Sequence, residues 1–309
     1  MARHSVAEVR REVARRLVVQ RFDVVHAEQL QALPQTAPAV ALGIPVFLRE
    51  QNVESDLWAA TARSRSGWRG RALALEARRL ARWEAAAVRR AGSVLALTNE
   101  DAKRLLELSG GVGSVRVVRA PFPELSAAGP PLPGEPAVVL LGSRGWLPNE
   151  DAVDWFLRQV WPAVAAQIPG AMLHLFAGGP GRGVPGRIAL HPAPRDSAGA
   201  FAPGSILAVP LRIASGVRMK VLEAWARGVP VVATPEALSG LAAVDGREVL
   251  SAAGVSQFVQ AISRLHRESG LADRLVAEGR RALRERHDPA RVAADLIAAY
   301  ENPGPSHPR

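Results

Sequence analysis

Short apolar runs alternate with longer amphipathic segments along the chain, a pattern that predicts strands separated by helices. In the first part of the chain, β-branched and other apolar residues cluster at 22–27, 45–49, 93–98 and 115–118. Residues 73–90 have apolar positions at helical spacing and a dense charged face, as in a long surface helix. Because parallel strands need long crossovers, which are usually helices, the pattern predicts an α/β fold with parallel sheets.

The composition changes once along the chain, and the change divides it in two. Residues 124–136 are rich in Pro, Gly and Ala without any period, as expected for a linker. A buried strand at 137–142 and a helix at about 151–164 then open a second α/β domain. We predict, in chain order, a first Rossmann-like domain at 1–123, the linker at 124–136, a second Rossmann-like domain at 137–288, a final helix at 289–301 that packs back towards the first domain, and a disordered tail at 302–309.

One stretch of the second domain, residues 213–237, combines a helix start, a helix end and two flanking strands. Ser215 and Gly216 suit the entry to a helix, Gly228 suits the position just past its end, and Pro230 prevents continuation. The helix is therefore expected at about 217–227, between buried strands at 206–211 and 229–233.

Two cations fall at the start of this helix, where the macrodipole favours anions. Arg218 and Lys220 would each oppose the dipole by about 0.3 to 1 kcal/mol if exposed, whereas a bound dianion would turn both into favourable partners. Glu223 shares the face of Lys220 one turn deeper, where a carboxylate can accept hydrogen bonds from sugar hydroxyls. Of 39 basic residues only Lys103 and Lys220 are lysines. The pattern indicates a nucleoside diphosphate site; the alternative is a solvated helix face on which Glu223 supports Lys220 and Arg227.

The run PLRIASGVRMKVLEAWARGVPVVATPEALSGL at 210–241 resembles the donor-binding motif of retaining GT-B glycosyltransferases. The resemblance implies two doubly wound α/β domains facing across a cleft. It also implies that Arg218 and Lys220 bind the donor diphosphate and that Glu223 binds the donor ribose. The family often has a Glu where this chain has Ser215, so Ser215 and Gly216 are candidates at the position of the transferred sugar.

Two further loops resemble binding segments of that family. The loop 142–149, GSRGWLPN, follows a strand, where small residues let a ligand approach the backbone, and the resemblance implies that Gly142, Ser143 and Asn149 contact the donor. The loop 48–55, LREQNVES, matches a cleft segment, with Gln51 where the family commonly has His and Asn52 in place. The alternative for Gln51 and Asn52 is a loop whose polar residues satisfy one another.

Composition and charge narrow the class of protein and its partners. The chain of 309 residues has no cysteine, which excludes disulfides and fits a cytoplasmic protein. Its net charge of +10 admits anionic partners, but the arginines are spread along the chain and aromatic residues make up only 5%, which argues against nucleic acid. Seven arginines between 63 and 82 favour either a solvated surface or peripheral contact with the inner, anionic face of a membrane.

The activity implied by the resemblance is transfer of a sugar from a nucleotide-diphosphate sugar to a glycan, lipid or small-molecule acceptor, with retention and without a metal or other cofactor. Two alternatives remain open: a nucleotide-sugar epimerase on the same fold, and a scaffold protein that binds nucleotide without turnover. Arg218 and Lys220 would stabilise the leaving diphosphate.

The first domain is expected to be incomplete. The chain opens on a helix at 5–19, and about four strands precede the linker, which would leave a sheet edge or an apolar face uncovered at Val24 and Val25. We therefore expect either an upstream coding start or a partner chain or second copy covering that edge, and poor sugar transfer by this chain alone.

Overall fold

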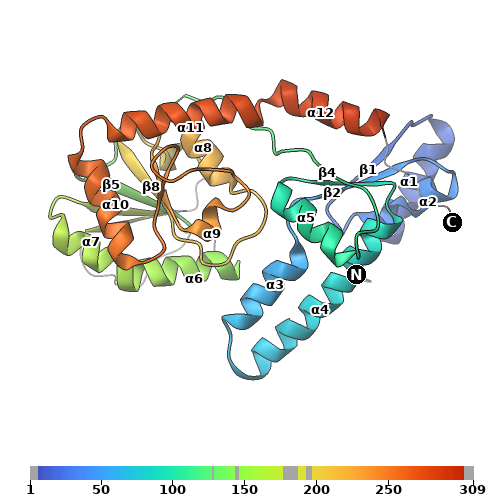
Figure 1. Cartoon of the computed structure of the whole chain (residues 1–309), viewed down its shortest axis with the longest axis horizontal. Coiled ribbons are helices and arrows are strands. Elements are labelled where there is room, and N and C mark those ends of the chain that lie inside the picture. The colour runs from blue at the N-terminus through green and yellow to red at the C-terminus, as the bar shows by residue number, and fades with distance from the viewer. Residues whose placement is uncertain (1–5, 127–128, 143–145, 177–186, 193–196, 303–309) are drawn as a thin grey trace. The chain divides into compact units, whose positions relative to one another are not determined.

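The computed structural model describes residues 6–126, 129–142, 146–176, 187–192 and 197–302. Its contacts divide the chain into two compact units. Unit 1 comprises Met1–Ala120, Ser215–Val217 and Ala290–Arg309, and unit 2 comprises Pro121–Ala214 and Arg218–Pro289. Each unit contains a parallel sheet with helices, so the predicted α/β class is confirmed (Figure 1).

Unit 1 is built on four parallel strands in the order β1-β2-β3-β4. In chain order its elements are α1 (Ala7–Val19), β1 (Val25–Glu28), the 3-10 turn η2 (Leu33–Thr36), α2 (Ala37–Ala41), β2 (Val46–Glu50), α3 (Glu54–Arg63), α4 (Gly67–Arg90), β3 (Ser93–Ala96), α5 (Asn99–Leu108), β4 (Val115–Val117) and, from the end of the chain, α12 (Pro289–Glu301). The four predicted strand regions of the first domain thus all contain a strand.

The two faces of this sheet are covered by different helices. Successive strand residues point to opposite faces, so Leu48 packs with Ala87 and Leu105 of α4 and α5, whereas Phe47 packs with Val292 of α12. The last helix therefore completes the core of unit 1.

Of the two forms of the expectation at Val24 and Val25, an uncovered apolar face is wrong, whereas a sheet edge at β1 is confirmed. Val24 was predicted to be left uncovered, but it packs against the cluster that α12 forms on the sheet. The chain end returns to cover a position that the local sequence alone leaves exposed. Strand β1, which follows Val24, does lie at the edge of the sheet.

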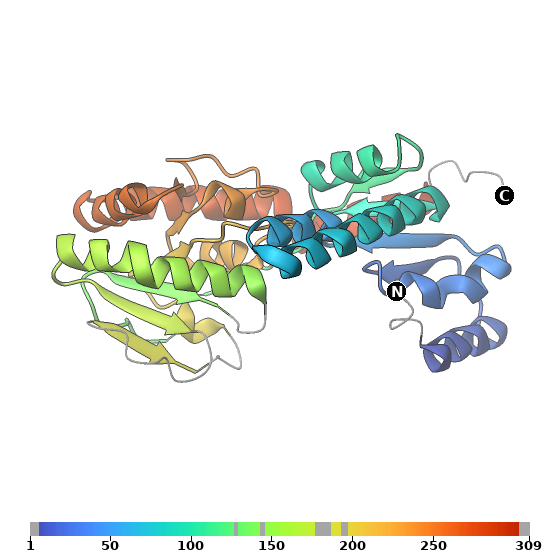
Figure 2. The ribbon, with the colours of Figure 1, turned by 90° about the horizontal axis from the view of Figure 1, so that it is seen from below.

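Helices α3 and α4 lie side by side as a hairpin (Figure 2). Glu84 of α4 is fully buried and accepts hydrogen bonds from the backbone N–H of Ser55 at 3.3 Å and from the Ser55 hydroxyl. These bonds satisfy the first turn of α3 and join it to the middle of α4.

Unit 2 is built on six parallel strands in the order β10-β9-β8-β5-β6-β7. In chain order its elements are β5 (Ala137–Leu141), α6 (Leu147–Trp155), the π-helical turn η3 (Phe156–Val160), α7 (Trp161–Gln167), β6 (Met172–Phe176), β7 (Ile188–His191), the 3-10 turn η4 (Ala198–Ala200), β8 (Ser205–Val209), α8 (Met219–Arg227), β9 (Val231–Ala233), α9 (Pro235–Leu238), β10 (Leu250–Ser251), α10 (Val255–Arg267) and α11 (Leu271–His287). Counted from β5 as the first strand, this is the doubly wound order 3-2-1-4-5-6 read from the other edge.

Helices cover both faces of the sheet of unit 2, with α6 and α7 on one side and α8 and α11 on the other (Figure 1). Trp225 of α8 is buried, and its indole N–H donates to the carbonyl of Glu248 at 3.2 Å. Gly279 of α11 faces this ring so closely that a Cβ atom there would lie 2.7 Å from Trp225 Cγ. The missing side chain of Gly279 thus sets how near α11 approaches α8.

Two helix starts differ from the prediction. Helix α8 begins at Met219 rather than at about 217, because the preceding residue, Arg218, has ψ of 90°, in the extended region. Helix α6 begins at Leu147 rather than at about 151, with Pro148 in its first turn, where a missing N–H costs nothing. Strands β7 and β10 were not predicted; both are short edge strands.

None of the helices in the described ranges combines the length and hydrophobicity that a bilayer span requires.

The contact between α8 and α11 can be tested by Gly279→Ala. The added methyl would overlap the Trp225 ring, and overpacking of this kind costs about 1 to 3 kcal/mol. Chemical denaturation should therefore show a lower free energy of unfolding for the variant. Gly199→Ala is the control, because a Cβ at Gly199 meets nothing within 4 Å; equal losses for both variants would contradict the packing argument.

Candidate functional site

The strand order of unit 2 brings the carboxyl ends of β5 and β8 side by side. In doubly wound sheets the chain reverses its winding between these two strands, and the crevice outside their carboxyl ends is where ligands bind. Gly142 directly follows β5 and is buried, and a Cβ there would lie 2.6 Å from Val153 Cγ2. Glycine at this position therefore lets Val153 of α6 pack against the end of β5.

Lys220 reaches this same point from the first turn of α8. Its ammonium group donates to the carbonyl of Leu141, the last residue of β5, at 2.9 Å. Burial, together with the smaller effect of the nearby Arg218 charge, lowers the pKa of Lys220 to about 8. Among the described residues, no carboxylate forms a recorded ion pair with Lys220. Lys220 thus links the start of α8 to the last residue of β5.

Arg218 is the residue that precedes α8, and it is buried, with 7% of its surface exposed. Two cations are therefore held in a poorly solvated place at a helix start. An anion at this helix start would interact favourably with both cations and with the backbone N–H groups. The electrostatics of the site fit a phosphate-bearing ligand.

Glu223 lies one turn further along α8 and is held by two partners. Its carboxylate accepts from the Ser197 hydroxyl at 2.5 Å and from Arg227 Nε at 2.9 Å. Glu223 and Arg227 side chains are each only 13% exposed. The alternative for Glu223 was a solvated helix face on which it supports both Lys220 and Arg227. The structure shows the pair with Arg227, whereas Lys220 bonds to Leu141.

The other candidates for contact with the donor, Asn149 and Ser143, do not both lie in a described loop. Asn149 is buried in the first turn of α6 rather than in the preceding loop, because that helix starts early. Ser143 lies outside the described residues. At the edge strand β7, His191 stacks on Phe176 with ring centroids 4.2 Å apart and bonds to His174 Nδ1 at 3.0 Å, and burial lowers the pKa of His191.

The candidates of the loop after β2 are engaged with neighbouring residues of unit 1. The Gln51 amide donates to Glu28 at 2.8 Å and accepts from Gln29 at 3.0 Å. Ser215, which groups with this unit, accepts from the backbone N–H of Val53 at 3.0 Å. A Cβ at Gly216 would collide with the carbonyl of Gln51 and with Asn52. The partners of Gln51 and of the Val53 N–H lie outside the loop 48–55, so other segments of unit 1 already engage these loop residues.

Two buried glutamates of unit 1 were not singled out from the sequence. Glu50 ends β2, is 2% exposed, and has its pKa raised to about 9 by burial and by the charges of Glu84 and Glu54. Burial also raises the pKa of Glu84, to about 7, against the opposing effect of its bonds to Ser55. The sequence signal for a buried acid was a glutamate close after the apolar run VFL at 46–48. The burial of Glu50 itself depends on helices that follow β2 in the chain.

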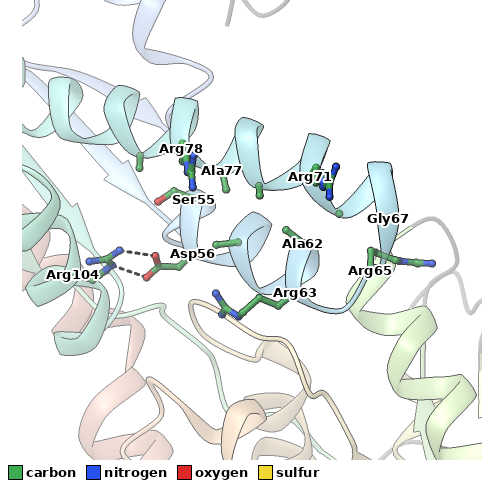
Figure 3. A pocket seen from close by; sticks show the side chains of 14 residues that line it. Ser55, Asp56, Ala62, Arg63, Arg65, Gly67, Arg71, Ala77, Arg78 and Arg104 are labelled. Atoms are coloured by element: carbon green, nitrogen blue, oxygen red, sulfur yellow. Dashed lines mark hydrogen bonds and ion pairs between the residues drawn. The ribbon is translucent and has the colours of Figure 1, made fainter.

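A hollow of about 590 Å³ lies between α3 and α4 in unit 1. Its floor is made largely of alanine and glycine, and five arginines line it, namely Arg63, Arg65, Arg71, Arg78 and Arg104. Figure 3 shows Arg104 joined to Asp56 by two hydrogen bonds, of 2.8 and 3.0 Å. The hollow is therefore strongly basic.

The described residues contain no group of three or more histidine, aspartate or glutamate side chains that could hold a metal ion.

Residues 135–268 match the protein-family model described as "Glycosyl transferases group 1". Among solved structures, sucrose-phosphate synthase from Thermosynechococcus elongatus is 15% identical with a TM-score of 0.70, over 91% of this chain and 73% of that chain. HepE from Anabaena, solved with UDP-glucose, is 14% identical with a TM-score of 0.69, over 96% and 81% of the two chains.

A third structure, TarM, is 10% identical with a TM-score of 0.69, and here the match covers 90% of this chain but 54% of TarM. No match was found among curated protein sequences. At these identities the structures establish a shared fold, and that fold is the GT-B fold expected from the motif at 210–241.

The burial of Glu50 predicts that the stability of the protein depends on pH. Its folded-state pKa of about 9 lies above the ordinary glutamate pKa of 4.5, so the folded protein holds the proton more tightly and stability falls as pH rises between these values. Glu50→Gln, which mimics the neutral acid, should be more stable than the parent at pH 8.5 by at least about 1 kcal/mol and nearly equal to it at pH 5.

Denaturation curves at the two pH values measure this difference. Glu76→Gln is the control, because Glu76 is an exposed residue of α4 and its substitution should leave the pH profile unchanged. A variant whose stability tracks the parent at every pH would show that Glu50 is not the group responsible.

Proposed function

From a chain that has the GT-B fold and a second unit that matches group 1 glycosyl transferases, we propose a glycosyltransferase that uses a nucleotide-diphosphate sugar. The sugar passes to an acceptor hydroxyl with retention at the anomeric carbon and without a metal. HepE was solved with UDP-glucose, which supports a donor of this chemical class for a protein of the same fold. The absence of cysteine is compatible with a cytoplasmic setting.

The observation that carries the proposal is the position of Lys220. A half-buried ammonium group with a lowered pKa touches the end of β5, beside Arg218 and at the place where a doubly wound sheet receives its ligand. Sugar transfer breaks the bond between the anomeric carbon and the diphosphate oxygen, and the diphosphate leaves with the electron pair. Lys220 and Arg218 would stabilise that developing charge, and fixed cations can do so without a metal ion.

Glu223 and Gly142 have supporting roles in this proposal. Glu223 would accept hydrogen bonds from the ribose hydroxyls of the donor, either alongside Ser197 or in its place, while Arg227 holds the carboxylate in position. Gly142 would let the diphosphate approach the backbone after β5.

A second candidate function is nucleotide binding without turnover. It is favoured by Ser215 at the position where the family often has Glu, and by Gln51, whose amide is already engaged by Glu28 and Gln29. Product analysis separates these two functions, and also the epimerase alternative. A transferase yields a glycosylated acceptor and free nucleoside diphosphate, an epimerase yields an altered sugar without acceptor, and a scaffold protein yields neither.

The proposed diphosphate site is tested by Lys220→Ala. Loss of a charged hydrogen bond should weaken binding of a nucleoside diphosphate by about 1.5 to 3 kcal/mol. In the parent protein the affinity should also fall roughly tenfold from pH 7 to pH 9, because Lys220 loses its proton above a pKa of about 8. A thermal screen of nucleoside diphosphates against the parent protein first selects the one that raises its melting temperature most. Calorimetry with that ligand then measures both effects.

Lys103→Ala is the matched control, since Lys103 is the other lysine and its side chain is 81% exposed. Equal affinities for the parent and Lys220→Ala, or a flat pH profile for the parent, would overturn the assignment. Turnover with the corresponding nucleotide sugar and an acceptor panel then distinguishes transfer from binding alone.

The ribose role is tested by Glu223→Gln. A nucleotide offers hydroxyl donors to the carboxylate and pyrophosphate does not, so the variant should lose affinity for the nucleotide while pyrophosphate binding barely changes. Competition calorimetry with the two ligands gives the comparison. Parallel losses for both would mean that Glu223 acts on the diphosphate or on the fold instead.

A further inference from the structure

The outward face of α4 carries large apolar side chains that the fold leaves in solvent. Trp68, Leu75 and Trp83 are 75%, 59% and 45% exposed. Steps of 7 and 8 residues are about 1.9 and 2.2 helical turns, so the three side chains lie within about 80° of one another around the helix and form a ridge along α4. This set, Trp68, Leu75 and Trp83, is called the α4 ridge below.

The core of unit 1 does not need this face. The opposite side of α4 is buried through Ala77, Ala85, Ala87 and Val88, and Glu84 on that side is satisfied by Ser55. Helix α4 is therefore held by its inner face, and the α4 ridge adds no packing to the unit.

Arginines accompany the ridge along its whole length. Between 63 and 83 the chain has seven arginines, and Glu76 is its single acidic residue, so the segment carries a net charge of 7 − 1 = +6. Glu76 pairs with Arg79 at 3.7 Å, and Arg69 lies over the Trp68 ring at 5.6 Å. Within the described ranges, no ion pair is recorded for Arg71, Arg78 or Arg82. Figure 3 shows Arg71 and Arg78 along α4, with Arg63 and Arg65 at the far end of the hairpin.

We propose that the α4 ridge is a docking surface for a membrane rich in anionic lipid. The helix would lie in the plane of the interface, with the indole rings and Leu75 at the boundary between headgroups and acyl chains and the arginines on the lipid phosphates. Tryptophan favours this boundary because its ring is apolar and its N–H is polar, and arginine adds electrostatic attraction to anionic lipid.

The charge and shape of the surface favour this partner over two others. A second copy of the chain would bring two segments of charge +6 together, and these segments repel each other. Single-stranded nucleic acid binds in a groove that presents aromatic faces to successive bases, whereas Trp68 and Trp83 stand 15 residues apart on a convex helix, about 22 Å along its axis.

The proposal concerns unit 1 alone, so it can be tested without nucleotide and stands or falls independently of the sugar-transfer proposal. The experiment is flotation of the full chain with vesicles of phosphatidylcholine containing 30% phosphatidylglycerol, and with vesicles of phosphatidylcholine alone. The parent should float with the anionic vesicles, bind the neutral ones far less, and be released by high salt.

Two sets of variants divide the surface. Arg71→Gln, Arg78→Gln and Arg82→Gln together should lower partition to the anionic vesicles by roughly 100-fold. Trp68→Ser with Trp83→Ser should lower it by roughly tenfold or more while keeping the charge. All five side chains are exposed, so melting temperatures should stay at the parent value, which confirms that the variants are folded.

The controls keep the same chemistry elsewhere on the chain. Arg264→Gln, Arg274→Gln and Arg281→Gln together remove three arginines from unit 2, and Trp146→Ser removes an exposed tryptophan there. Partition of the α4 variants equal to that of these controls, or equal binding to neutral vesicles, would overturn the proposal. Displacement from anionic vesicles by a single-stranded oligonucleotide that binds more tightly at physiological salt would instead identify nucleic acid as the occupant.

Discussion

The pairing of β5 with β8 is the constraint on which the candidate site depends. These strands are far apart in the chain but adjacent in the sheet, and each is followed by a loop that leads into a helix. Their adjacency puts Gly142 and the start of α8 at one edge, where Lys220 bonds to the last residue of β5. A parallel sheet with a different strand order would separate the two loops, and no local property of either loop could bring them together.

Desolvation acts in both units, with opposite consequences for the two kinds of charge. It lowers the pKa of Lys220, so part of the population loses its positive charge near neutral pH, and it raises the pKa of Glu50, so the acid keeps its proton. Buried ionisable groups of this kind cost stability unless a partner compensates them. For Lys220 a phosphate ligand would be that partner, whereas Glu50 is accommodated as a neutral acid in the core of unit 1.

The α3–α4 hairpin shows how one helix can serve both the core and a surface. The inner face of α4 is fixed by small apolar residues and by the bonds between Glu84 and Ser55, which leaves the outer face free to vary without loss of the fold. Arginine and tryptophan occupy that face, and their long side chains cover surface without contributing to the interior. The outer face of α4 is therefore available to a partner without cost to the core of unit 1.

The sequence by itself determined the local features, because these depend on neighbours in the chain. Apolar periodicity predicted the α/β class, Gly228 and Pro230 marked the end of α8, where Gly228 has φ of 74°, and the spacing of Arg218 and Lys220 placed two cations at the start of that helix. The motif at 210–241 was enough to indicate the GT-B fold, since its residues are contiguous.

Tertiary structure decided whatever depends on partners distant in the chain. The extended conformation of Arg218 sets the start of α8 at Met219, and Gly216 packs against Gln51 in a left-handed conformation. The return of α12 to the sheet of unit 1 covered Val24, and helices arriving after β2 buried Glu50. The lowered pKa of Lys220 likewise arises from burial, which no pattern of neighbouring residues encodes. Burial is a sum over contacts from the whole fold. The sequence therefore identified the charged residues of the site but not the shifts in pKa that burial produces.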